Sequence, residues 1–239
     1  MANAFTPSGV DRPYDMTKIA ESIIKSIPNT FESHYLRFWK DNPSEEAYEH
    51  LQKAFEMAPE RYETYHDLIT KAEFERDINS MKKFSELWYH YEFYSPGITN
   101  WNYNVLMSVE PNAILVTQGD NDTYPLWLLQ YVKNIRRDVT VLNANILLQN
   151  EYRKTIFEET GIAPFEKTIE DFKSRTAYFN AITEHVVKNA PRQVYFGLSL
   201  TKPLQSLWEE NLYLTGLTFK YSEHQFDNKA VIRNNFDFF

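Results

Sequence analysis

Hydrophobic residues in the first third of the chain recur every three or four positions, the spacing of an amphipathic helix. The pattern runs from Met16 to Tyr94 and is interrupted by short turn sequences that contain proline. It predicts a helical region, which we assign to residues 16–98. Residues 1–15 lack this periodicity, so we expect them to form a flexible arm.

A period of 34 residues is present within the helical region. The stretch 47–59 carries Ala47, Leu51, Ala54 and Pro59. It resembles the second helix of a tetratricopeptide repeat, in which small residues let paired helices approach closely and proline ends the unit. The aligned positions of the two repeats are Phe31 and Tyr65, Phe38 and Ala72, Ala47 and Met81, and Ala54 and Trp88. Because roughly three repeats are needed to bury a continuous core, we expect these helices to pack on the rest of the chain.

In the second half of the chain the pattern changes to short, continuously apolar runs. Residues 113–117 and 139–143 are such runs, which are typical of strands buried on both faces. The segment between them, 124–133, has helical spacing, so the three predict a βαβ unit with parallel strands. Further strands are expected at 194–198 and at 217–221, the latter at an edge of the sheet.

Other segments around these strands predict helices at residues 102–108, 147–159, 169–187 and 204–214. The expected fold class is therefore α/β. Tetratricopeptide-like helices would pack on a small, mainly parallel sheet of three to four strands with flanking helices. We assign the α/β domain to residues 99–239.

Polar residues follow the first two expected strands. Ligands bind at the carboxyl edge of parallel strands, so these polar residues are candidates for a site. The candidate ligand-binding residues are Asp120, Asn121, Asp122, Thr123, Asn143 and Asn145. Ser199 and Thr201 follow the third expected strand and would complete the same pocket.

The chemistry of the loop leaves three interpretations open. Asp120 and Asp122 could hold a divalent cation, because carboxylates are hard oxygen ligands. They could instead accept hydrogen bonds from sugar hydroxyls. They could also serve the fold alone, because Asp122 or Thr123 is suited to cap a helix that has Pro125 in its first turn. We assign no catalytic residue, metal site or cofactor.

Composition narrows the possible functions. The 239 residues include 25 Lys and Arg against 33 Asp and Glu, a net charge of −8. This acidity argues against a general nucleic-acid binder, which needs a basic face. No apolar run approaches the roughly 18–20 residues that span a bilayer, so we expect no membrane span. The six glycines argue against common nucleotide-binding loops, and the absence of cysteine excludes disulfides.

Aromatic residues make up 16 % of the chain and are dense between residues 31 and 103. They are Tyr35, Phe38, Trp39, Tyr62, Tyr65, Trp88, Tyr89, Tyr91, Phe93, Tyr94, Trp101 and Tyr103. Such side chains either form the core between helices or bind sugars and partner proteins. Tyr89, Tyr91 and Tyr94 cannot all lie on one face of a helix, so some should be exposed. None of the six histidines has a zinc-binding spacing.

Three segments resemble the soluble C-terminal part of a family of bacterial envelope proteins of unknown function. They are residues 112–148, 192–200 and 211–222, and the first carries the sequence Gly-Asp-Asn-Asp-Thr-Tyr-Pro-Leu-Trp. Members of that family usually begin with a membrane portion similar to protein O-mannosyltransferases. This sequence contains no such portion, so the resemblance implies a soluble recognition or accessory role without the transfer chemistry.

Together these observations predict a non-enzymatic envelope module that binds or scaffolds a protein or glycan partner. The alternative is a metal-assisted hydrolase or a glycosyl-transfer accessory enzyme that uses Asp120 and Asp122. The resemblance implies a periplasmic location. The start of the sequence lacks the basic and apolar regions of a signal peptide, so a cytoplasmic location stays open. The terminal Phe236–Phe239 is expected to dock on the domain or to form a contact surface.

Overall fold

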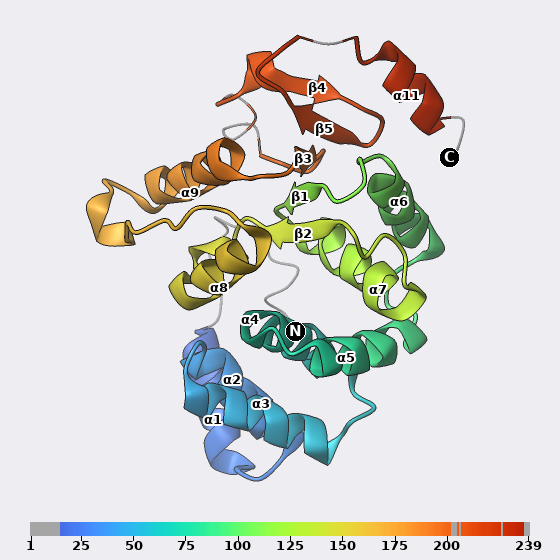
Figure 1. Cartoon of the computed structure of the whole chain (residues 1–239). Helices are drawn as coiled ribbons and strands as arrows, with labels where there is room; N and C mark the ends of the chain where they lie inside the picture. The colour runs from blue at the N-terminus through green and yellow to red at the C-terminus, as the bar shows by residue number, and fades with distance from the viewer. Residues whose placement is uncertain (1–14, 202–204, 206, 226, 237–239) are drawn as a thin grey trace. The chain divides into compact units, whose positions relative to one another are not determined.

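The computed structural model describes residues 15–201, 205, 207–225 and 227–236 (Figure 1). The described part of the chain divides into two compact units, one ending at Ala72 and the other beginning at Glu73. The expected arm and the last three residues of the phenylalanine-rich tail lie outside the described residues, apart from Asp15. The domain boundary expected at residue 98 stays a prediction.

The first unit is helical, as expected. Its elements are α1 (Met16–Ser26), α2 (Phe31–Asp41), α3 (Glu45–Met57), the 3₁₀ turn η2 (Tyr62–Thr64) and most of α4 (Tyr65–Glu75). Each of the first three helices begins at a capping side chain that accepts a hydrogen bond from a backbone N–H in the first turn. These caps are Asp15, Thr30 and Ser44.

The 34-residue period is visible in the structure. The helices α2 and α3 form one pair, and α4 and α5 (Ile78–His90) follow at the repeat distance. All eight aligned positions are buried. Ala47 and Ala54 have no exposed surface, which agrees with the close helix approach that small residues allow.

The second unit contains a five-stranded sheet, which confirms the α/β class. Its strands are β1 (Ile114–Thr117), β2 (Thr140–Asn143), β3 (Val194–Gly197), β4 (Leu212–Leu214) and β5 (Thr218–Tyr221). They lie in the order β2-β1-β3-β5-β4. The strand β1 runs parallel to β2 and β3, as the βαβ pattern predicts, whereas β5 is antiparallel to β3 and β4.

Three details of the expected sheet are wrong. It has five strands instead of three to four, and it is mixed instead of mainly parallel. Residues 212–214, which we expected at the end of a helix, form β4 and leave β5 inside the sheet instead of at its edge. The reason is a tight turn in which Thr215 N donates to Thr218 O at 2.9 Å and Gly216 adopts a φ of 116°.

The helices of the second unit cover both faces of the sheet (Figure 1). The described helices of this unit are α5, α6 (Pro96–Met107), α7 (Tyr124–Lys133), α8 (Asn150–Thr160), α9 (Arg175–Asn189) and α11 (Lys229–Phe236), of which α5 packs on α7. On one face, apolar residues of α8 and α9 pack against alternate residues of β1, β2 and β3 in one core. On the other lie α6 and α7, and α7 is buried almost all round between its neighbours.

Two helices begin elsewhere than expected because their caps determine the start. The helix α6 starts six residues before the expected Asn102, since Ser95 caps it and Pro96 fits its first turn. The helix α9 starts six residues after Ile169, since Ser174 is its cap. No helix within the described ranges is long and apolar enough to cross a membrane.

Candidate functional site

The side chain of Asp122 closes the loop that follows β1. Its carboxylate accepts hydrogen bonds from the backbone N–H groups of Gln118, at 3.2 Å, and Gly119, at 2.6 Å. It also accepts one from the hydroxyl of Ser199, which follows β3. Asp122 therefore shapes the 3₁₀ turn η3 (Asp120–Asp122) and ties the loop after β1 to the loop after β3.

Thr123 and Asn143 form the buried frame beneath this loop. The Thr123 hydroxyl donates to Gly119 O at 2.7 Å and accepts from Asn143 Nδ2 at 2.9 Å. It lies 2.7 Å from the hydroxyl of Thr117. The Asn143 side-chain oxygen accepts from the backbone N–H of Asn145 at 2.8 Å. These contacts connect the carboxyl ends of β1 and β2, so Thr123 and Asn143 position the loop from below.

Two more side chains join the loops at this edge. Asn145 Nδ2 donates to Gln118 O at 2.7 Å, and Thr201 N donates to the Gln118 side-chain oxygen at 2.9 Å. The loops after β1, β2 and β3 are thus held together by polar contacts. The parallel order of the strands brings them to one edge, as the sequence predicts.

A cavity of about 400 Å³ lies against this edge. Its lining residues come from α6 and from the loops after β1 and β3. They are Gly97, Ile98, Trp101, Asn102, Gly119, Asp120, Asn121, Asp122 and Ser199. Of the six candidate residues, Asp120, Asn121 and Asp122 line the cavity, whereas Thr123, Asn143 and Asn145 do not.

Asn102 supplies an unpaired polar atom that the sequence did not indicate. Its side-chain nitrogen donates to Ile98 O and to Asn121 O, each at 2.9 Å, which fixes the orientation of the amide. Its side-chain oxygen is buried and finds no hydrogen-bond donor in the described part of the chain. An acceptor buried in this way costs about 1–3 kcal/mol, which a ligand donor would recover.

Trp101 and Asp120 give the cavity an apolar side and a charged side. The Trp101 side chain is 47 % exposed. Asp120 is exposed, and its carboxylate has no hydrogen bond or ion pair with any residue of the described ranges. Burial, together with the charge of Asp120, raises the pKa of the Tyr94 hydroxyl. Among the described residues, no lysine or arginine lines the cavity, so the charge of the described lining is negative.

Sequence reasoning missed the contribution of α6 to this cavity. Trp101 was one of many aromatic residues in a region that the helical pattern also explains. Asn102 was placed at the first turn of a helix, whereas it lies in the second half of α6. The sequence carried no signal that distinguished Asn102, because α6 contains three asparagines.

The described residues contain no group of three or more His, Cys, Asp or Glu side chains that could hold a metal ion. In the first unit, His34 and His50 form a buried pair with their Nδ1 atoms 2.8 Å apart. Burial lowers the pKa of both rings. This pair connects α2 to α3, and we interpret it as a contact that stabilises the packing of the two helices.

Comparison with known proteins gives one match. Residues 98–160 are similar to the family described as TMEM260-associated domain 2, a domain of unknown function. The matched segment runs from α6 to the end of α8 and covers about a quarter of the chain. No curated protein and no solved structure matches the chain. The match fits an uncharacterised family of envelope proteins and carries no evidence of a mannosyltransferase motif.

Proposed function

We propose that this chain is a non-enzymatic binding module of the cell envelope that recognises a neutral glycan in the cavity lined by α6 and the loop after β1. The observation that carries the proposal is the composition of the cavity. It combines the exposed ring of Trp101 with the acceptors of Asp120 and Asn102. We expect the envelope location from the resemblance of residues 98–160.

The chemistry of a sugar suits this lining. One face of a pyranose ring carries C–H groups, which pack against the apolar face of an aromatic side chain such as Trp101. Its hydroxyls are donors, which the carboxylate of Asp120 and the side-chain oxygen of Asn102 can accept. Ligand sites generally combine an apolar wall with a few placed polar groups.

The charge of the lining favours neutral ligands over anionic ones. Asp120 and Asp122 both line the cavity, and none of the lining residues in the described ranges is basic. A phosphate or carboxylate entering here would therefore meet like charge without a compensating cation. A neutral sugar avoids that repulsion.

Asp122 is less available than Asp120 for chemistry. Its carboxylate already accepts three hydrogen bonds, two from backbone N–H groups and one from Ser199. An enzyme that used both carboxylates would have to break these contacts during its reaction. For this reason we favour binding over the metal-assisted hydrolase or glycosyl-transfer alternative.

The proposal is tested by saturation-transfer NMR with glucose, mannose, galactose and N-acetylglucosamine. We expect at least one of these sugars to bind with a dissociation constant in the range of about 1 mM, or −4 kcal/mol. Trp101→Ala and Asp120→Asn should each weaken binding at least tenfold. Tyr103→Ala on the same helix and Trp39→Ala, which removes a 60 % exposed tryptophan of the first unit, are the matched controls.

Three results would overturn the proposal. The first is that no neutral sugar binds, or that Trp101→Ala binds sugar as the unmodified chain does. The second is a rise in melting temperature with Mg²⁺ that disappears in Asp120→Asn, which would support the metal-assisted enzyme instead. A protein partner whose capture survives Trp101→Ala would equally place recognition elsewhere.

A further inference from the structure

A second cavity, of about 530 Å³, lies at the opposite, amino edge of the parallel strands. Thr140 is the first residue of β2, and Arg192 lies two residues before β3. The rest of the lining comes from the end of α8 and from the residues that directly follow α4 and α8. The lining residues are Arg76, Thr140, Ile156, Glu158, Glu159, Thr160, Gly161 and Arg192. Unlike the first cavity, this one has two arginines.

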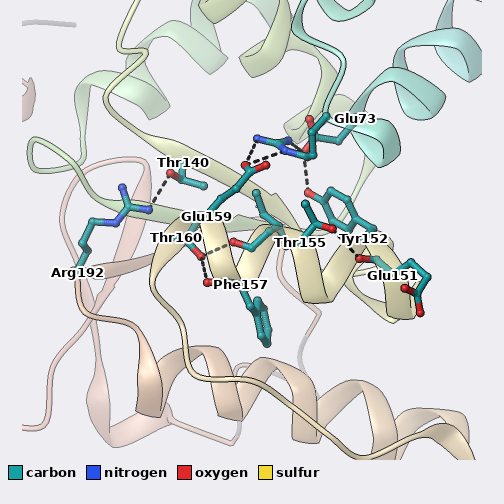
Figure 2. Close-up of polar contacts among 11 residues, drawn as sticks. Glu73, Thr140, Glu151, Tyr152, Thr155, Phe157, Glu159, Thr160 and Arg192 are labelled. Carbon is teal, nitrogen blue, oxygen red and sulfur yellow. Dashed lines mark hydrogen bonds and ion pairs between the residues drawn. The ribbon is translucent and has the colours of Figure 1, made fainter.

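Arg76 is fully engaged within the protein. It donates to Glu73 at 2.5 Å and to Glu159 at 3.0 Å, so two carboxylates share its charge. Tyr152 donates to the same Glu73 carboxylate at 2.6 Å. Figure 2 shows these contacts joining the carboxylate of Glu159 to the buried Glu73 and Tyr152. Arg76 therefore has little capacity for a ligand.

Arg192 is different, because its charge has no partner. Its guanidinium donates to the hydroxyl of Thr140 at 2.9 Å (Figure 2). Within the described ranges it makes no other hydrogen bond and no ion pair, although a guanidinium carries five N–H donors. The side chain is half-buried, and burial lowers its pKa. A cation held in this way is costly unless an anion joins it.

We propose that this cavity binds a small oxyanion, the phosphate or carboxylate group of a ligand, on the guanidinium of Arg192. The planar fork of arginine pairs with two oxygens of such a group at once. The hydroxyl of Thr140 accepts from Arg192, which leaves the hydroxyl proton for a ligand oxygen. Nothing in this proposal depends on sugar binding in the first cavity.

Glu158 limits how much negative charge a ligand in this cavity can carry. It is exposed and lines the cavity, while Glu159 is already paired with Arg76. Glu158 therefore repels a second negative group on the same ligand. The cavity should favour ligands with a single anionic group, and removing the Glu158 charge should tighten binding.

The test is an NMR titration of the full chain with sodium phosphate and sodium acetate at constant ionic strength, with sodium chloride as the reference salt. We expect the backbone amide signals of Thr140 and Gly161 to shift with at least one of the two anions and not with chloride. Tighter binding of phosphate would assign a phosphate ligand, and tighter binding of acetate a carboxylate ligand.

Three variants decide the origin of the shifts. Arg192→Gln should weaken anion binding at least tenfold, and Glu158→Gln should strengthen it about threefold. Arg175→Gln, which removes an exposed arginine at the start of α9, is the control and should bind as the unmodified chain does. The proposal fails if Arg192→Gln keeps the affinity, if chloride produces the same shifts, or if Glu158→Gln leaves the affinity unchanged.

Discussion

Glu73 is a buried carboxyl group whose protonation should make the stability of the protein depend on pH. Its side chain is only 3 % exposed, and it contacts Arg76 and Tyr152. Burial raises its pKa from the ordinary 4.5 to about 7, against the opposing effect of the Arg76 charge. The folded chain therefore holds this proton up to a higher pH than the unfolded chain does.

The sign and size of the effect follow from this difference. Below pH 4.5 the Glu73 carboxyl group is protonated in both the folded and the unfolded chain. The contribution of this group to the free energy of unfolding is then fully present. Between pH 4.5 and 7 the unfolded state loses the proton while the folded state keeps it, so the free energy of unfolding falls as pH rises. A rise in pKa from 4.5 to about 7 corresponds to a loss of about 3 kcal/mol across that window.

Glu73→Gln isolates this contribution, because glutamine resembles the protonated acid and does not titrate. Urea unfolding at pH 5, 6, 7 and 8 gives the free energy of unfolding of both proteins. The value for Glu73→Gln minus that for the unmodified chain should increase by about 2–3 kcal/mol from pH 5 to pH 8. Glu75→Gln, on the exposed side of the same helix, is the control for loss of a carboxylate. A difference that stays constant from pH 5 to pH 8 would refute the reasoning.

Three further predictions concern stability. Asp122→Ala removes the acceptor of three hydrogen bonds and should lower the free energy of unfolding by about 1–3 kcal/mol in urea titrations. Ala54→Leu adds volume at a fully buried position of the repeat and should cost about 1–3 kcal/mol, measured by thermal unfolding. The lowered pKa of the His34 and His50 rings predicts that their own contribution to stability falls as pH drops below about 6.5, opposite in direction to the effect of Glu73. His50→Leu should reduce that loss, and an unchanged pH profile by circular dichroism would contradict it.

The parts of the fold that were predicted correctly depend on local patterns. The apolar runs around Leu115 and Leu142 are too short for helices and are separated by a segment of helical spacing, which is sufficient to predict parallel pairing. The 34-residue period likewise identified positions such as Ala47 and Ala54, which are buried. In these cases each residue's environment follows from its neighbours in the sequence.

The parts that were missed depend on contacts between distant residues. Leu212–Leu214 is too short to differ from the end of a helix, and only its pairing with β5 makes it a strand. Asp122 could be identified as a cap from its position. Its bond to Ser199, which lies 77 residues away, follows only from the packing of β3 beside β1. The isolation of Arg192 is likewise a property of its surroundings and leaves no local pattern.

The site residues predicted from the sequence lie at the carboxyl edge of the parallel strands, and those that line the cavity there form only one of its walls. The other wall is α6, where successive residues differ in direction by about 100°. Trp101 is therefore exposed while its neighbour Asn102 is buried, yet both line the cavity. A ligand that reaches the unpaired oxygen of Asn102 would meet a ring and an acceptor from one turn of one helix. This arrangement explains why the affinity for sugars should depend on Trp101 as strongly as on Asp120, although only the acidic loop is evident in the sequence.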